Sequence, residues 1–263
     1  MTLAKKTYGV FRYRQTQNLG DAIQTVALSR LLPGTLKGIR RTDGKGPHCS
    51  WLVANGWLGN NRPPAPGISE PCLFAGIFVA GDHNLEWLRR SPCPIGTRDP
   101  DTHAKVLQAG LKAEMIGCAT LTFPPYRGRR SGVYNVDSNV SDSSRIDVKI
   151  THHISRNMSW RDQWLRALAV LDLYRTASLV FTSRLHVALP CIAFGTPVMF
   201  TCPDPKRIND PLVLNRISLL RSLGVTSGVI ANVKAEAIGN TYRAFLEHNL
   251  NIRIEEHPPR FPS

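Results

Sequence analysis

The sequence predicts an α/β protein with two doubly wound units. Short apolar segments alternate with amphipathic segments along the 263-residue chain, a pattern typical of strands joined by crossover helices. The alternation is interrupted over residues 124–147, where prolines, arginines, serines and aspartates gather. We therefore expect two Rossmann-like domains, residues 1–145 and residues 146–263.

The first half opens with a strand over residues 8–13, a polar loop, and a helix over 22–32 that Pro33 and Gly34 end. A later helix has Asp99 as its N-cap and Pro100 at its first position. The other expected elements are a strand at 36–39, a strand at 50–54, a near-continuously apolar strand at 73–80, a helix at 83–90, the Asp99-capped helix to 109, and a strand at 115–123.

The second half repeats the alternation. Ser159 and Asp162 have the spacing of a capping box that opens a helix to residue 175. The remaining elements are strands at 148–150, 178–182 and 197–201 and helices at 184–194, 212–223 and 235–248. The strand–helix–strand run over 178–201 has the short joints of a βαβ unit.

Composition favours an anionic partner. The chain has 33 Lys and Arg against 19 Asp and Glu, a formal charge of +14, which suits nucleic acid, phosphorylated metabolites or an anionic membrane surface. No apolar run reaches the length of a membrane span, and the first residues lack a signal-like apolar region, so we expect a cytoplasmic protein. The six cysteines are scattered without a CxxC pair, and no metal site is implied.

The segment 179–200 has the strongest chemical signal. A buried strand ends at Thr182, and Arg184 and His186 fall in the first turn of the next helix. Helix N-termini at the carboxyl edge of a parallel sheet bind anions, so these residues suit a phosphate or carboxylate. The alternative is a surface ion pair for Arg184 and a packed position for His186.

Two shorter segments have related features. Gly20 lets a ligand approach the backbone between the first strand and helix, and Asp21 could act as a base or bind hydroxyls; alternatively, Asp21 is only an N-cap. Arg98 also precedes a helix, and its alternative is a solvated side chain. The sequence contains no GxGxxG, GxSxG, Walker A or HExxH motif.

In this order, the segments 18–33, 52–58, 95–123, 150–154 and 177–198 resemble the polysaccharide pyruvyl transferase family, particularly its short single-chain members. The resemblance implies two Rossmann-like domains in a GT-B-like arrangement, with the active site in the interdomain cleft. It also implies phosphoenolpyruvate as donor and a sugar hydroxyl pair as acceptor, giving a pyruvate ketal.

The resemblance implies that Arg98, Arg184, Leu185 and His186 contact phosphoenolpyruvate. The phosphate and the carboxylate of the donor are both anionic, so they favour a site with two facing cations. Arg98 and Arg184 would supply one cation from each half. His186 is the candidate acid or phosphate ligand, and Asp21 the candidate base or acceptor ligand. Asn18 and Gly20 complete the expected binding residues, and Phe78 stands where the family leads us to expect a histidine.

The expected partners are phosphoenolpyruvate and a glycan, lipid-linked or nucleotide-linked sugar acceptor, with no cofactor, no metal and no specific nucleic acid. Peripheral contact with an anionic membrane at its inner face fits the charge. Two alternatives remain open. One is a GT-B glycosyltransferase whose nucleotide-sugar diphosphate occupies the same basic cleft, and the other is a non-catalytic, basic nucleic-acid-binding protein.

Overall fold

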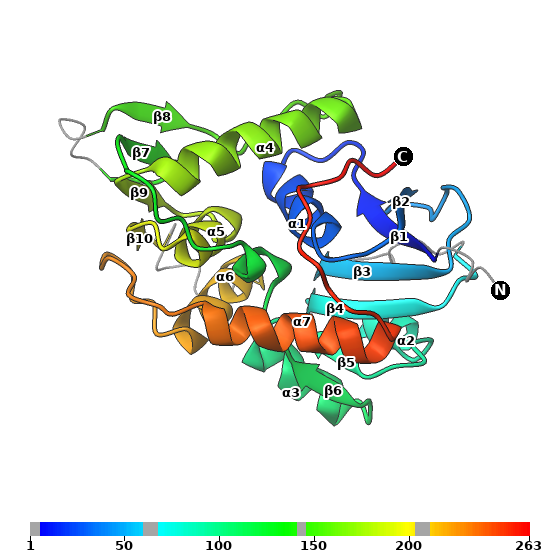
Figure 1. Cartoon of the computed structure of the whole chain (residues 1–263). Coiled ribbons are helices and arrows are strands. Elements are labelled where there is room, and N and C mark those ends of the chain that lie inside the picture. The colour runs from blue at the N-terminus through cyan, green and yellow to red at the C-terminus, as the bar shows by residue number, and fades with distance from the viewer. Residues whose placement is uncertain (1–5, 60–67, 141–145, 203–210) are drawn as a thin grey trace.

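The first half forms a six-stranded parallel sheet in the order β2-β1-β3-β4-β5-β6 (Figure 1). The computed structural model describes residues 6–59, 68–140, 146–202 and 211–263. The order reverses between β1 and β3, and ligands of open α/β sheets bind at such switch points. The strands are β1 (Thr7–Arg12), β2 (Thr35–Arg40), β3 (Trp51–Leu58), β4 (Cys72–Val79), β5 (Ile95–Thr97) and β6 (Ala113–Met115).

Helices cover both faces of this sheet. One face, with Val10 and Ala75, packs against α1 (Leu19–Ser29) and α7 (Glu236–Leu250). The other face, with Phe74, packs against α2 (Leu85–Leu88) and α3 (Pro100–Gln108). Because both faces are covered, β4 is buried along its whole length, as its continuous apolar sequence predicts.

The second half forms a four-stranded parallel sheet in the order β10-β9-β7-β8. The described sheets thus confirm the predicted α/β class with two Rossmann-like units. This sheet also reverses order, between β7 and β9. Its elements are β7 (Val133–Val136), β8 (Val148–Ile150), α4 (Trp160–Thr176), β9 (Leu179–Thr182), α5 (Leu185–Phe194), β10 (Val198–Phe200) and α6 (Pro211–Ser222).

Several elements differ from the prediction. The expected strand at 115–123 is wrong, because β6 ends at Met115 and a 3-10 turn, η2 (Ala119–Thr122), follows. The expected interruption at 124–147 contains β7, so the second sheet begins at Val133, ahead of residue 145. The prolines and arginines of that segment therefore lead into a strand.

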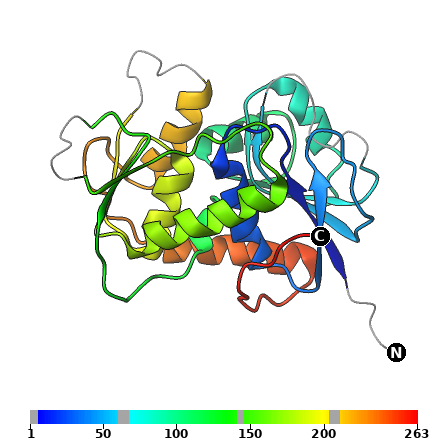
Figure 2. The ribbon, with the colours of Figure 1, turned by 90° about the horizontal axis from the view of Figure 1, so that it is seen from above.

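One hydrophobic core joins the two sheets. It includes Ile23 and Leu28 of α1, Trp164 of α4 and Leu189 of α5, all buried. Figure 2 shows α4 and α7 running across both lobes. The halves are therefore fixed to each other by packed side chains, which places the ends of their strands in one region.

The C-terminal segment returns to the first sheet. The hydroxyl of Tyr242 in α7 donates to the carbonyl of Ala75 in β4 at 3.0 Å. Farther on, the Gly38 N–H donates to the Ser263 carbonyl at 2.8 Å, beside β2. The last residues of the chain thus pack against the sheet that the first residues form.

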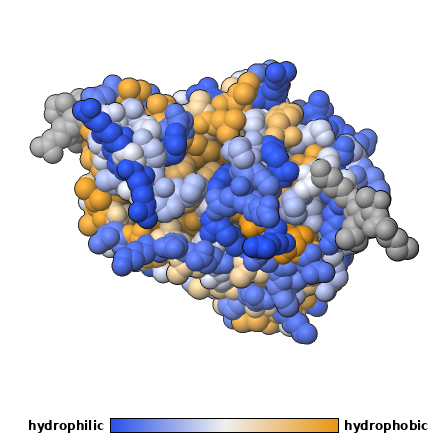
Figure 3. All heavy atoms as spheres, in the orientation of Figure 1, coloured by the Kyte–Doolittle hydropathy of each residue, from blue (hydrophilic) through white to orange (hydrophobic). Residues whose placement is uncertain are grey.

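The surface is mixed in character. Among the described residues, the exposed large apolar side chains are dispersed over several elements, and Figure 3 shows hydrophilic and hydrophobic residues interspersed on one face. In the same part of the chain, no helix combines the length and apolar character needed to cross a bilayer.

We expect Tyr242→Phe to lower the free energy of unfolding by about 1–3 kcal/mol, because the buried Ala75 carbonyl loses its side-chain donor. Chemical denaturation measures the change. Tyr126→Phe is the control, since the Tyr126 hydroxyl donates to the Arg129 carbonyl in an exposed setting. Equal losses in both variants would contradict the role assigned to the α7 contact.

Candidate functional site

Two loops join the carboxyl edges of the two sheets. The Leu19 N–H donates to the His152 carbonyl at 2.9 Å, and the Ile154 N–H donates to the Gln17 carbonyl at 3.2 Å. These bonds flank an antiparallel bridge between Asn18 and His153. The loop after β1 is therefore held against the loop after β8, and residues from both halves meet there.

Asn18 caps helix α1. Its side-chain oxygen accepts from the Gly20 N–H at 3.2 Å, and its amide donates to Asp21 Oδ1 at 3.3 Å. The Thr16 hydroxyl donates to Asp21 Oδ2 at 2.7 Å. Because Asn18 supplies the cap, the alternative in which Asp21 is only an N-cap is wrong, and the carboxylate in the first turn of α1 accepts hydrogen bonds from the preceding loop.

The carboxyl group of Asp21 has a perturbed acidity. Burial raises its pKa, and the hydrogen bonds from Thr16 and Asn18 and the charge of Arg41 oppose that rise only in part. A carboxyl group with a raised pKa is a better proton acceptor than an ordinary aspartate. Asp21 can therefore act as a general base once a hydroxyl group is within reach.

Arg184 lies at the N-cap of α5 and is held by two partners. Its Nε donates to Asp137 Oδ2 at 2.8 Å, and its Nη2 lies 2.6 Å from His153 Nε2. Asp137 follows β7, His153 follows β8 and Arg184 follows β9. The three side chains thus gather at the carboxyl edge of the second sheet, where ligand sites of such sheets form.

Asp137 has a lowered pKa and a strained backbone. Burial alone would raise its pKa, but the His152 N–H, the Thr151 side chain and Arg184 together outweigh that effect. Its φ of 52° places it in the left-handed region, where strain is commonly found at functional sites. Asp137 therefore stays ionised and fixes the Arg184 guanidinium.

His186 lies directly against the start of α1. A Cβ on Gly20 would come within 2.9 Å of His186 Nδ1 and 3.1 Å of its Cβ. His186 itself departs from helical geometry, with φ −82° and ψ 22° inside α5. Glycine at position 20 is thus required by the close approach of a histidine from the other half.

Arg98 is buried in the first half, with 1 % of its surface exposed. Its Nε lies 3.8 Å from Asp99 Oδ2, and its guanidinium carbon lies 5.3 Å from the Phe78 ring centroid. Within the described part of the chain, none of its three guanidinium nitrogens has a hydrogen-bond partner. Burial lowers the pKa of Arg98 and raises that of Asp99.

Residues 80–201 match a model of the polysaccharide pyruvyl transferase family. This is the family that the sequence resembles, and the match covers 122 of the 263 residues. The matched range contains Arg98, Asp137, His153, Arg184 and His186. A search of curated proteins finds no relative of the chain.

Several solved structures have a distant likeness to the chain. An uncharacterized protein from Klebsiella pneumoniae is 14% identical, with a TM-score of 0.45 over 81% of this chain and 88% of that one. A putative UDP-N-acetylglucosamine 2-epimerase from Listeria monocytogenes is 9% identical, with a TM-score of 0.43 over 97% and 100%. The Methanocaldococcus jannaschii UDP-GlcNAc 2-epimerase is 11% identical, with a TM-score of 0.40 over 96% and 95%.

The predicted site residues occupy different settings. Asn18, Gly20 and Asp21 lie beside His186 at the joint between the halves. Leu185 is 4% exposed and packs in the core. The solvated alternative for Arg98 is wrong, because this side chain is buried beside Phe78.

Sequence reasoning missed Asp137 and His153 as partners of Arg184. Asp137 lies in the segment interpreted as a domain boundary, so its strand was not recognised. His153 lies in the segment 150–154 of the resemblance, and nothing in its spacing relates it to Arg184. His152 instead packs in the core, where burial lowers its pKa to about 3 and its Nε2 lies 2.7 Å from the Tyr174 hydroxyl.

We expect Gly20→Ala to destabilise the protein by about 1–3 kcal/mol, because the added methyl group overlaps the His186 side chain. Thermal denaturation of Gly20→Ala, His186→Ala and the double variant forms a thermodynamic cycle. If the contact is the cause, the double variant recovers part of the loss. Strictly additive losses would contradict the close approach.

We expect Thr16→Val to raise the pKa of Asp21 further, because the lost hydrogen bond favours the ionised carboxylate. Titration of the Asp21 side chain by NMR measures this shift. Thr42→Val, in an exposed loop, serves as the control and leaves the titration unchanged. A lower or unchanged pKa in Thr16→Val would show that the hydroxyl does not support the carboxylate.

Proposed function

We propose that this protein transfers a pyruvyl group from phosphoenolpyruvate to a sugar of a cell-surface glycan or its precursor. The contact between Gly20 and His186 carries the proposal, since it brings the Asn18–Asp21 loop of one half to the Arg184–His186 turn of the other. A candidate proton acceptor, a fixed cation and an imidazole then lie in one region. The match of residues 80–201 to the polysaccharide pyruvyl transferase model supports this reaction class.

Arg184 is suited to hold an anionic part of the donor. Asp137 and His153 engage its Nε and Nη2 and fix the direction of the planar guanidinium. The N–H groups at the start of α5 and the helix dipole add to the positive potential there. A phosphate or carboxylate could therefore bind without a metal ion to neutralise it.

Arg98 supports the same proposal from the first half. A buried guanidinium without hydrogen-bond acceptors is unfavourable, and Asp99 at 3.8 Å compensates only its charge. A donor anion would supply the missing acceptors. We propose that Arg98 binds the second anionic group of phosphoenolpyruvate, with Phe78 as the wall beneath its guanidinium.

The reaction moves two hydroxyl protons and one phosphate. The methylene carbon of phosphoenolpyruvate gains a proton, and C2 gains oxocarbenium character. One sugar hydroxyl forms a C–O bond to C2 and loses its proton, and the bond between C2 and the bridging oxygen breaks as phosphate leaves. The second hydroxyl then forms the other C–O bond of the ketal, and its proton leaves with the phosphate, so that of the two hydroxyl protons one balances the proton gained by the methylene carbon. We assign His186 to proton delivery or phosphate binding and Asp21 to deprotonation of the attacking hydroxyl.

We expect Arg184→Ala to weaken phosphoenolpyruvate binding roughly ten- to a hundredfold, the effect of losing a charge-assisted hydrogen bond. Arg184→Lys recovers only part, because lysine lacks the bidentate fork. Calorimetric titration measures both, with the exposed Arg175→Ala as control. Unchanged donor affinity in a folded Arg184→Ala protein would overturn the assignment.

We expect His186→Gln to lower kcat more than donor affinity, because the transferred proton matters chiefly in the transition state. Product mass after incubation with phosphoenolpyruvate and candidate glycans measures turnover. A nucleotide sugar offered in place of phosphoenolpyruvate tests the glycosyltransferase alternative. Transfer from that donor alone would replace the proposed reaction.

A further inference from the structure

A strongly basic pocket of about 940 Å³ is lined in part by the loop that follows β1. We name it the arginine pocket, and its main lining residues are Arg12, Arg14, Arg40, Arg156, Ser159 and Trp160. Arg12 ends β1 and Arg40 ends β2, whereas Trp160 begins α4. The pocket therefore lies between the two halves of the chain.

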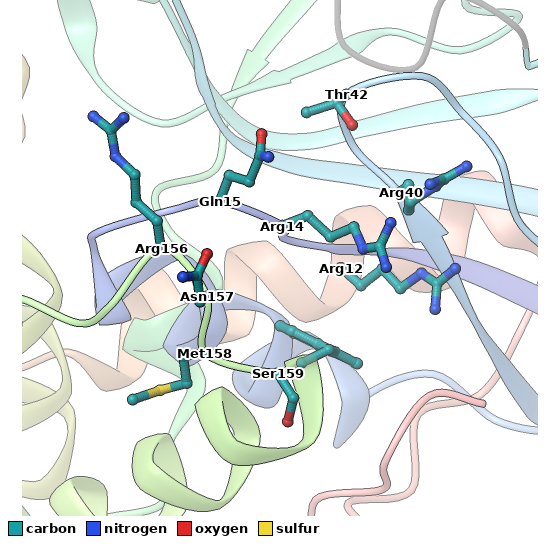
Figure 4. Close-up of a pocket in the computed structure, with 10 residues that line it drawn as sticks. Arg12, Arg14, Gln15, Arg40, Thr42, Arg156, Asn157, Met158 and Ser159 are labelled. Carbon is teal, nitrogen blue, oxygen red and sulfur yellow. The ribbon is translucent and has the colours of Figure 1, made fainter.

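The arginines are arranged on two sides of the space. Figure 4 shows Arg12, Arg14 and Arg40 close together on one side and Arg156 on the other. Burial and the charges of Arg40 and Arg14 lower the pKa of Arg12. Asp43, the carboxylate paired with Arg40 at 3.0 Å, offsets one of these charges. The cluster therefore keeps an excess of positive charge.

The walls of the pocket also contain hydrogen-bond donors that lack acceptors. Within the described residues, the buried Nε atoms of Arg12 and Arg40 and the indole Nε1 of Trp160 have no hydrogen-bond partner. All three are N–H groups of side chains that line the pocket, so a ligand that reached them would have to bring acceptor atoms. Clustered guanidinium groups that repel one another are stabilised by an anion between them.

We propose that the arginine pocket is a binding site for a diphosphate ester, distinct from the Arg184–His186 site. A diphosphate offers several acceptor oxygens and more than one negative charge, which match guanidinium groups on two sides of a pocket. The volume suits a small molecule with a further group attached to the diphosphate. Trp160 and Met158 give that group an apolar surface.

The position of the pocket suggests what the diphosphate carries. Gln15 lines the pocket with a φ of 56°, in the left-handed region, and Asn18 and Asp21 follow within the same loop and helix start. On the basis of the proposed function, a sugar linked to the bound diphosphate is the acceptor whose hydroxyl groups reach Asp21. The loop after β1 would then contact both substrates.

Calorimetric titration with inorganic pyrophosphate tests the site. We expect the wild-type protein to bind pyrophosphate, and Arg12→Gln and Arg156→Gln each to weaken binding roughly tenfold or more. Arg156 is exposed in a loop, so this variant keeps the test valid if Arg12→Gln does not fold. Arg89→Gln removes the same charge from an exposed position beside Glu86 and leaves binding unchanged.

Three results would overturn the proposal: no binding by the wild type, equal weakening in all three variants, or no weakening in either pocket variant. Tighter binding of a random single-stranded DNA, lost in the same two variants, would instead assign the pocket to nucleic acid. Once pyrophosphate binding is established, a nucleoside diphosphate and a short-chain prenyl diphosphate are tested as competitors that displace bound pyrophosphate. Stronger displacement by one of them supports the proposal and shows which kind of diphosphate ester the pocket binds. Failure of both to displace pyrophosphate contradicts the proposal.

Separate titrations distinguish the two proposals. Pyrophosphate binding that depends on Arg12 and Arg156, without any phosphoenolpyruvate binding, would leave the diphosphate site intact and overturn the pyruvyl transfer. Phosphoenolpyruvate binding that depends on Arg184, without pyrophosphate binding, would do the opposite.

Discussion

The hydrogen-bonded joint between the loop after β1 and the loop after β8 determines where the side chains of the candidate site lie. The two backbone bonds that involve Leu19 and Ile154 fix segments that are far apart in the sequence. Behind them, α1 packs in the same core as α4 and α5. Because the backbone and the core both hold this joint, His186 can approach Gly20 closely and Asp21 keeps its half-buried position.

The positions of the arginines show which part of the chain's positive charge is gathered in the candidate site and in the arginine pocket. Arg98 is buried without hydrogen-bond acceptors among the described residues, Arg184 is fixed by Asp137, and Arg12 lies among other guanidinium groups. The settings of Arg98 and Arg12 do not favour stability by themselves, since burial lowers the pKa of both side chains and neighbouring like charges lower that of Arg12 further. Such settings are typical of sites that bind anions, and they separate these arginines from solvated ones such as Arg89.

Much of the fold could be predicted because its local signals agree with the final structure. The Ser159 side chain accepts from the Asp162 N–H, as the capping box predicts, and Asp99 caps α3 with Pro100 in the first turn. The apolar residues at 115–123 led to the wrong prediction of a strand. A short apolar run without periodicity indicates burial, but it does not distinguish a strand from a 3-10 turn. The same limit affects β7, a short strand inside a polar segment.

The residues of the candidate site could be predicted where they lie together in one segment of the sequence. Their hydrogen-bond partners could not be predicted where these come from distant segments. Arg184 and His186 share a turn, so the strand end and helix start identify them. The partners Asp137 and His153 depend on the order of strands in the sheet, which spacing does not reveal. Likewise, the burial of Arg98 follows from helices packing around β5, and a single arginine in a sequence gives no sign of it.

The central claim is that one phosphoenolpyruvate molecule binds across the joint between the two halves. Hydrogen exchange measured with and without phosphoenolpyruvate tests it most directly, because protection is resolved along the chain. We expect protection both at residues 16–21 and at residues 182–187, with slower exchange at the Leu19 amide that bonds to His152. Protection confined to one half, or none at saturating phosphoenolpyruvate, would contradict the account.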